Sequence, residues 1–212
     1  MVLRFLVFRV LSDVCVHVDH SLHTTLLASS LVSNGTVTLS EDQQTLQAVA
    51  APTEAALLVA AHKFGLAQTE VRQRYPRVFE VPFNSSRKLQ LTVHSLFPSS
   101  AGRLSLSQET KEEGVFGTLA VPRGATSMIC VQGSPDRLLQ LCKFALTSSG
   151  QVCALEAESA ERREIMQQVD AYSSQALRVI AVAFAPIQNL PFDPSRSGTD
   201  PLPALCISQE TD

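Results

Sequence analysis

The sequence predicts an α+β fold, an antiparallel β-sheet of about six strands flanked by helices. Residues 77–83 and 88–97 alternate apolar and polar side chains and follow each other closely, as the two strands of a hairpin do. Other stretches carry apolar residues at helical spacing, without a strict strand-helix alternation. With 45% hydrophobic residues among 212, the chain can bury the core that such a domain needs.

The N-terminal residues 1–19 are predicted to form an extension or an edge strand of the domain. They are apolar, but Arg4, Arg9 and Asp13 interrupt them, so no run is long enough to span a bilayer. They also lack the cleavage site of a secretory leader. A strand is therefore expected here, and the chain as a whole is expected to be soluble.

Four helices are predicted from apolar residues at helical spacing. The segments are 20–32, 52–65, 134–146 and 158–177. The second has the clearest signals, because Pro52 and Glu54 stand in its first turn and Gly65 follows its last periodic residue. Ser134 is the predicted N-terminal cap of the third helix.

The predicted strands are short runs of alternating or continuously apolar residues. The hairpin residues expected to share one buried face are Val78, Val81, Leu89, Leu91 and Val93. Residues 178–185 form an apolar run of the kind found in central strands. The remaining strands are expected near 115–121, at 127–132 and at the start of 35–49.

Two segments have the composition of irregular structure. Residues 98–114 are rich in Ser, Gly and charge and are expected to form a loop. After Pro186 the chain changes to Pro, Ser, Asp and Gly with little periodicity, so residues 188–212 are expected to be a disordered tail. One domain over residues 20–187 is the resulting prediction.

Neither a metal site nor a disulfide framework is predicted. His17, His20 and His23 lie three residues apart, but they straddle a strand-to-helix junction and lack a fourth ligand at the usual spacing. The cysteines are odd in number and form no C-x-x-C pair, so they are interpreted as reduced, buried thiols. They are Cys15, Cys130, Cys142, Cys153 and Cys206.

A basic stretch with interleaved aromatic residues raises nucleic-acid binding as a hypothesis. Its members are Arg72, Arg74, Arg77, Arg87 and Lys88, with Tyr75 and Phe83 among them. A solvated surface is the preferred interpretation, because the chain has a net charge of -3 and no nucleic-acid-binding motif accompanies the stretch. The sequence also lacks a G-x-S-x-G elbow, a Walker motif and a G-x-G-x-x-G loop, so no catalytic residue is predicted.

Four stretches together identify a family. They are "PTEAALLVAAHKFGL", "VFEVPFNSSRKLQLTV", "CVQGSPDRLLQLC" and "ALRVIAVAFA". In this order the chain resembles the nucleotide-binding (N) domain of P-type cation-transporting ATPases over roughly residues 20–187. The resemblance implies a cytoplasmic domain that binds ATP, with Mg²⁺ accompanying the nucleotide in a complete pump.

The resemblance also implies the residues that hold the nucleotide. Phe83 stacks on the adenine and Glu54 positions it, while Lys88 lines the same pocket. Arg178 faces the phosphates, and Gly133 lets the purine approach the backbone. An aromatic platform contributes on the order of 1–3 kcal/mol per base, and a charge-assisted hydrogen bond to phosphate contributes about 1.5–3 kcal/mol.

The sequence departs from the family at two places near this pocket. Gln132 replaces the Lys of the family turn "KGAPE", so we expect weaker nucleotide binding, by about 1–3 kcal/mol if that Lys makes a charge-assisted contact. Ala50-Ala51 replaces the Gly-Asp that precedes "PTEAAL". The alternative interpretation is therefore an interaction or regulatory module that kept the fold and lost the nucleotide.

The chain also lacks the family's "DKTGT" segment, whose Asp accepts the phosphoryl group. Hydrolysis of ATP by this chain alone is not expected, and its expected partners are ATP and the phosphorylation domain of a parent pump. The sequence predicts no contact with nucleic acid or with the membrane, and it resembles an excised domain or a degenerate stand-alone relative.

Overall fold

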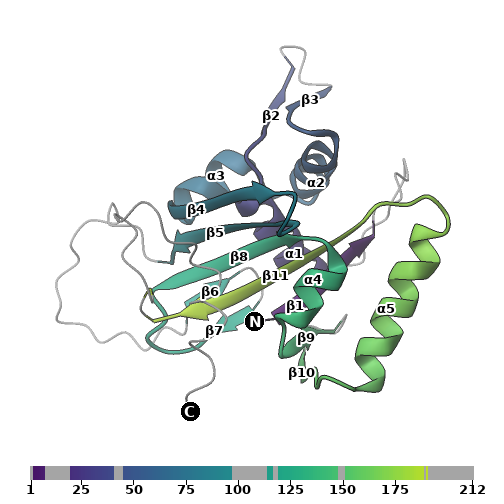
Figure 1. Cartoon of the computed structure of the whole chain (residues 1–212). Coiled ribbons are helices and arrows are strands. Elements are labelled where there is room, and N and C mark those ends of the chain that lie inside the picture. The colour runs from purple at the N-terminus through teal and green to yellow at the C-terminus, as the bar shows by residue number, and fades with distance from the viewer. Residues whose placement is uncertain are drawn as a thin grey trace.

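Seven strands of the chain form one sheet with helices on both of its faces (Figure 1). The computed structural model describes residues 2–7, 20–40, 45–96, 114–116, 119–147, 151–188 and 190. The strand order is β10-β9-β1-β11-β8-β5-β4, and only the β1–β9 pair among them is parallel. These strands are β1 (Val2–Val7), β4 (Arg77–Asn84), β5 (Leu89–Ser95), β8 (Ser127–Gly133), β9 (Phe144–Leu146), β10 (Val152–Ala154) and β11 (Val179–Ile187).

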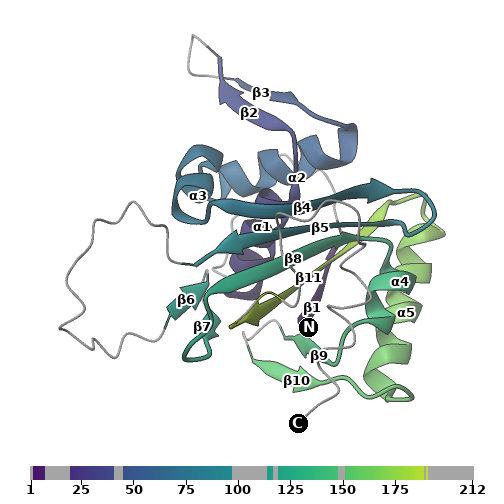
Figure 2. The same cartoon turned by 60° about the vertical axis from the view of Figure 1, so that its left-hand side comes forward.

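Two small two-stranded sheets lie outside the main one. They are β2 (Thr36–Leu39) with β3 (Leu46–Val49), and β6 (Gly114–Phe116) with β7 (Leu119–Val121). The β2–β3 hairpin projects from the body of the domain beyond the second helix in both views (Figure 2). The described residues thus contain more strands than the six or so predicted, but the antiparallel α+β architecture is confirmed.

Helices pack on both faces of the main sheet and divide the core in two. They are α1 (His20–Val32), α2 (Pro52–Lys63), α3 (Gln68–Arg74), α4 (Pro135–Gln140) and α5 (Ala160–Ser173). Side chains of α1, α2 and α3 form one hydrophobic cluster with the sheet. Side chains of α4 and α5 form the other on the opposite face.

Most predicted elements are confirmed, and the differences have local causes. The predicted helix 134–146 ends at Gln140, because residues 144–146 form β9 and pair with both β1 and β10. Ser134 does not cap this helix through its side chain; its hydroxyl donates to the Asp136 carboxylate instead. The apolar run at 178–185 is confirmed as the central strand β11.

Strand β1 lies between β9 and β11, inside the sheet rather than at its edge. Its partner β11 runs antiparallel to it, and Val2 stands opposite Phe184. Residues 8–19 lie outside the described part of the chain, as do almost all of the predicted tail and the predicted loop 98–114 except Gly114, which begins β6.

The hairpin β4–β5 buries more than the one apolar face that its alternation predicted. Leu89, Leu91 and Val93 share one buried face, as predicted, and this face packs against α4 and α5. The intervening polar residues of β5 are also buried, because they face the α1 side. Val78 is 45% exposed instead of buried, because the β4–β5 register shifts between Arg77 and Phe79.

Helix α1 is a buried helix that carries many small polar residues. Thr25, Ser29 and Ser33 each donate a hydroxyl hydrogen bond to the carbonyl four residues earlier, at 2.6, 2.8 and 2.9 Å. These bonds satisfy the hydroxyls inside the helix itself, so the helix can lie in the core without other polar partners for them. Its small side chains allow a close approach to the sheet and to α2.

The C-terminal end of α1 is held by arginines of the stretch that was interpreted as a solvated surface. Arg77 on β4 donates from Nη2 to the carbonyls of Leu31, Val32 and Ser33 at 2.6, 3.4 and 3.2 Å. Arg72 on α3 donates from Nη2 to the carbonyl of Ser33 at 3.0 Å. That interpretation is therefore wrong for these two residues, since they satisfy carbonyls left open where the helix ends.

Buried His94 forms a hydrogen bond with each of its ring nitrogens in its neutral form. Its Nδ1 lies 2.9 Å from the Tyr75 carbonyl, which can only accept, so Nδ1 carries the proton and Nε2 accepts from the Thr92 hydroxyl at 2.9 Å. Burial lowers the pKa of His94 from 6.5 to about 4, and the positive charges of Arg77 and Arg72 add to this.

The described cysteines are free, as predicted. Cys130 and Cys142 are buried, Cys153 is half-buried, and burial raises the pKa of the Cys130 thiol. Cys15 and Cys206 lie outside the described residues. Within the described ranges no three His, Cys, Asp or Glu residues are grouped to hold a metal ion. None of the five helices there combines the length and the apolar character that crossing a bilayer requires.

Replacing Arg77 with Met is expected to lower the free energy of unfolding by about 2–4 kcal/mol, because carbonyls at the end of α1 lose a charged donor. Urea denaturation measures the change. Arg163→Met, at an exposed position of α5, is the matched control and should change stability by less than about 0.5 kcal/mol. Equal effects of the two substitutions would contradict the structural role of Arg77.

Acid should destabilise the fold through His94. As pH falls from 6.5 toward 4, the unfolded chain binds a proton at His94 that the folded chain does not, so the folded state loses about 2–3 kcal/mol. Urea denaturation at about pH 7 and about pH 4.5 measures this loss. The His94→Gln variant should show a smaller loss over the same interval, and an unchanged loss would exclude His94 as its source.

Candidate functional site

A cleft of about 580 Å³ opens at one end of the main sheet. Four segments that are far apart in the sequence meet there: the first turn of α2, the β4–β5 turn, the end of β8 and the start of β11 (Figure 1). The six residues singled out in the sequence all line this cleft. They are Glu54, Phe83, Lys88, Gln132, Gly133 and Arg178.

The β4–β5 turn fixes the backbone that carries Phe83 and Lys88. The side-chain oxygen of Asn84 accepts from the backbone N–H of Ser86 at 2.8 Å, and the Lys88 N–H donates to the Asn84 carbonyl at 2.6 Å. Lys88 has a φ of 56°, a left-handed conformation that costs about 1–2 kcal/mol for a residue with a side chain.

Phe83 presents its ring to solvent at the mouth of the cleft, where it is 60% exposed. A large aromatic side chain of this exposure gains little from the hydrophobic core, so its stability value is small where it stands. The ring is therefore available as a platform for a flat ligand.

Gly133 is required by the contact between β8 and the β4–β5 turn. A Cβ atom at this position would lie 2.1 Å from the Lys88 carbonyl oxygen and 2.9 Å from Cδ2 of Leu89. The same carbonyl accepts from the Ser134 N–H at 3.0 Å, which ties the two segments together. The resemblance implied that this glycine makes room for a purine; the fold supplies a separate reason that involves no ligand.

Helix α2 forms the opposite wall with its first turn. Its N-terminal cap is Ala51, which supplies no side-chain hydrogen bond, whereas Asp or Ser at this place would satisfy an open backbone N–H. Arg178 donates from Nη1 to the Thr53 hydroxyl at 3.0 Å and so links the start of β11 to α2. Glu54 follows in the same turn and lines the cleft.

Two buried glutamines form part of the floor of the cleft. Gln90 and Gln132 stand opposite each other on β5 and β8, and they are 4% and 7% exposed. Gln90 donates from Nε2 to the Val32 carbonyl at 3.1 Å, and Gln132 donates from Nε2 to the Gln90 Oε1 at 3.4 Å. The sequence analysis missed Gln90, although its place two residues after Lys88 on an alternating strand could have indicated it.

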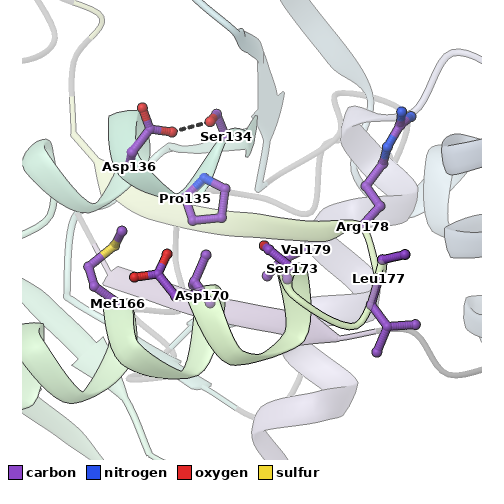
Figure 3. A pocket seen from close by; sticks show the side chains of 11 residues that line it. Ser134, Pro135, Asp136, Met166, Asp170, Ser173, Leu177, Arg178 and Val179 are labelled. Carbon is purple, nitrogen blue, oxygen red and sulfur yellow. Dashed lines mark hydrogen bonds between the residues drawn. The ribbon is translucent and has the colours of Figure 1, made fainter.

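A second hollow of about 540 Å³ adjoins the cleft on the α5 side and shares four of its lining residues, Ser134, Pro135, Arg178 and Val179. In Figure 3, Met166, Asp170 and Ser173 of α5 form one side of it, while Arg178 reaches away from that helix. The hydroxyl of Ser134 and the charge of Lys88 hold the pKa of Asp136 below its ordinary value, so this carboxylate stays ionised beside the hollow.

The described residues form an α+β domain with an open cleft that gathers an exposed aromatic ring and two cationic side chains. Small-molecule sites are commonly built in such clefts. The chain belongs to the family of the P-type ATPase cytoplasmic domain N, whose model matches residues 21–205. The family and the fold that the resemblance implied are therefore confirmed.

Individual relatives are cation pumps. The chain is 32% identical to the P-type sodium-transporting ATPase4 of Toxoplasma gondii over 76% of its length, and 30% identical to calcium-transporting ATPase 1 of Lactococcus lactis over 65%. It is 26% identical to the calcium-transporting ATPase of Bacillus subtilis over 83%. The matched part spans only 13%, 12% and 16% of these relatives.

Gly133→Ala should lower the free energy of unfolding by at least about 2 kcal/mol, because the added methyl overlaps the Lys88 carbonyl. Thermal or urea denaturation measures the loss. Gly65→Ala is the matched control, since Gly65 has a φ of 80° with nothing within 4 Å of the added atom, and it should cost only about 1 kcal/mol. A Gly133→Ala variant as stable as the control would refute the close contact.

Proposed function

We propose that this chain is the ATP-binding domain of a P-type cation-transporting ATPase. It holds ATP so that the γ-phosphate can reach an aspartate on a separate domain, and it takes no covalent part in the transfer. The observation that carries the proposal is that six residues from four distant segments line a single cleft, five of them implied by the family resemblance and the sixth, Gln132, at the place of a family Lys.

The adenine stacks on Phe83 in this proposal. The ring is 60% exposed at the mouth of the cleft, so a base can stack on it without any rearrangement of the hydrophobic core. Stacking of a base on one aromatic face contributes about 1–3 kcal/mol. Glu54, on the opposite wall formed by α2, positions the base from the other side.

Lys88 and Arg178 hold the phosphate side. Both line the cleft, one from the β4–β5 turn and one from the start of β11, so their charges approach the ligand from different segments. Each charge-assisted hydrogen bond to a phosphate oxygen contributes about 1.5–3 kcal/mol. Arg178 exchanges its bond to Thr53 for the phosphate when the nucleotide binds.

Mg²⁺ accompanies the phosphates rather than a dedicated protein site. Glu54 is the acidic residue among those that line the cleft, which is too few oxygen ligands for a protein cage. The metal would screen phosphate charge and depend on the separate domain for further ligands.

Catalysis by this module is catalysis by positioning. Phosphoryl transfer needs the phosphorus aligned with its acceptor, and a binding domain supplies that alignment without reactive groups. The partner is a phosphorylation domain, which carries the acceptor aspartate in the family. Cation transport, the activity named for the relatives, would belong to the whole pump. This domain would lie on the cytoplasmic side of the pump's membrane.

One observation favours a second function. Gln132 stands where the family turn has a Lys, so the cleft has one cation fewer for the nucleotide. A module that kept the fold for contact with another protein and lost ATP is the alternative. Titration of the wild-type chain with ATP separates the two, because only the first predicts saturable binding in the cleft.

Phe83→Ala should weaken ATP binding by about 5-fold to 100-fold, because the adenine loses its stacking partner. Isothermal titration or NMR titration measures the dissociation constant. Phe144→Ala is the matched control, since Phe144 is a half-exposed aromatic residue of β9 outside the cleft. If ATP binds the wild-type chain and Phe83→Ala leaves its affinity unchanged, the stacking assignment is wrong.

A further inference from the structure

The buried glutamine pair on the floor of the cleft can read the edge of a base. We propose that Gln132 makes the cleft select a base with an exocyclic amine, such as adenine, over a base with an oxygen at the same place. This inference rests on the proposed function, since it takes the ligand to be a nucleotide, and it assigns the selectivity to a hydrogen-bond chain of this particular protein.

The direction of that chain is fixed by a backbone group. The Val32 carbonyl, at the last residue of α1, can only accept a hydrogen bond, so the Gln90 amide must turn its NH₂ group toward it. The Gln90 oxygen then faces Gln132 and accepts from the Gln132 NH₂ group. The two ends of an amide are ordinarily hard to tell apart, but here one obligate acceptor orders both of them.

The consequence is a buried acceptor without a partner. The Gln132 Oε1 atom has no hydrogen-bond partner among the described residues, and the residue is only 7% exposed. A buried polar atom left in this condition costs about 1–3 kcal/mol. A ligand that donates to it recovers that loss, whereas a ligand that presents another acceptor leaves the oxygen unpaired and adds repulsion between two oxygens.

The place of Gln132 in the cleft lets this acceptor meet the edge of a bound base. Gln132 lines the same cleft as Phe83, so a base stacked at the mouth can extend its edge toward the floor. Adenine carries an amine donor at its C6 position, whereas hypoxanthine and guanine carry an oxygen acceptor there. Gln132 accepts from the first and opposes the second.

Three nucleotides test the inference by titration of the wild-type chain. ATP has an amine at C6, inosine triphosphate has an oxygen, and purine riboside triphosphate has hydrogen. We expect ATP to bind about tenfold more tightly than inosine triphosphate, with purine riboside triphosphate between them, because a neutral hydrogen bond is gained in one case and opposed in another.

Variants separate the acceptor from the chain that orients it. Gln132→Met keeps the length and removes the acceptor, so ATP should weaken to about the level of inosine triphosphate. Gln90→Met removes the orienting partner and lets the Gln132 amide turn either way, so the ratio of the two affinities should fall toward about one.

Gln140→Met is the matched control, because Gln140 is an exposed residue of α4 outside the cleft and its ratio should equal that of the wild-type chain. Thermal denaturation identifies any variant that fails to fold, and the wild-type nucleotide series decides the question without variants.

The outcomes keep the two proposals apart. If no nucleotide binds the wild-type chain, the proposed function fails. If ATP and inosine triphosphate bind with equal affinity, or if Gln132→Met retains the wild-type preference, nucleotide binding stands and the role of Gln132 is overturned.

Discussion

The open carbonyl groups at the C-terminal end of helix α1 are the constraint on which the rest of the structure depends. An α-helix leaves its last carbonyls without partners, and a buried end must find donors elsewhere. Arg77 of β4, Arg72 of α3 and Gln90 of β5 provide them, so three separate elements are tied to one point. The arginines hold the end of the helix in place, and Gln90 links the same helix end to the floor of the cleft.

The cleft exists because α1 ends before the sheet does. On β8, Met128 and Cys130 belong to the cluster that packs against α1, and the next residue on that face is Gln132. On β11, Val182 packs in the same cluster and Ile180 lines the cleft. The face that is core beneath the helix thus continues as the floor of the cleft beyond it, where Gln132 follows Met128 and Cys130 on β8.

Much of this fold could be predicted from the sequence, because periodicity reports whether a segment is a helix or a strand. The hairpin, α2 and the central strand β11 follow from it directly. Helix α3 was missed because its sequence, "QTEVRQR", has no apolar stripe. It is held by Val71 and the following Tyr75 in the core, and by hydrogen bonds from Gln68 and Arg72 to the Gly35 carbonyl. Strands β9 and β10 have three residues each, too few for a period to appear.

The candidate site was only partly predictable, for a different reason. The family resemblance supplied five residues and the position of a sixth, Gln132, and the structure brings them to one cleft. The roles of Gln90, Arg72 and Arg77 depend on hydrogen bonds to backbone carbonyls at the end of a distant helix. The sequence does not show which side chain will meet such a carbonyl. Residue types alone therefore did not indicate the roles of Arg72 and Arg77.

The place of β1 in the sheet has a consequence for how the chain folds. β1 pairs with β11, and Val2 stands opposite Phe184. This pairing cannot form until almost the whole described chain has been synthesised. Contacts between such distant residues carry a large loop-closure cost and slow the search for the native topology. During synthesis the hairpin and β8 can assemble before β11 is made, so β1, the first of the described strands in the sequence, is among the last to take its place in the sheet.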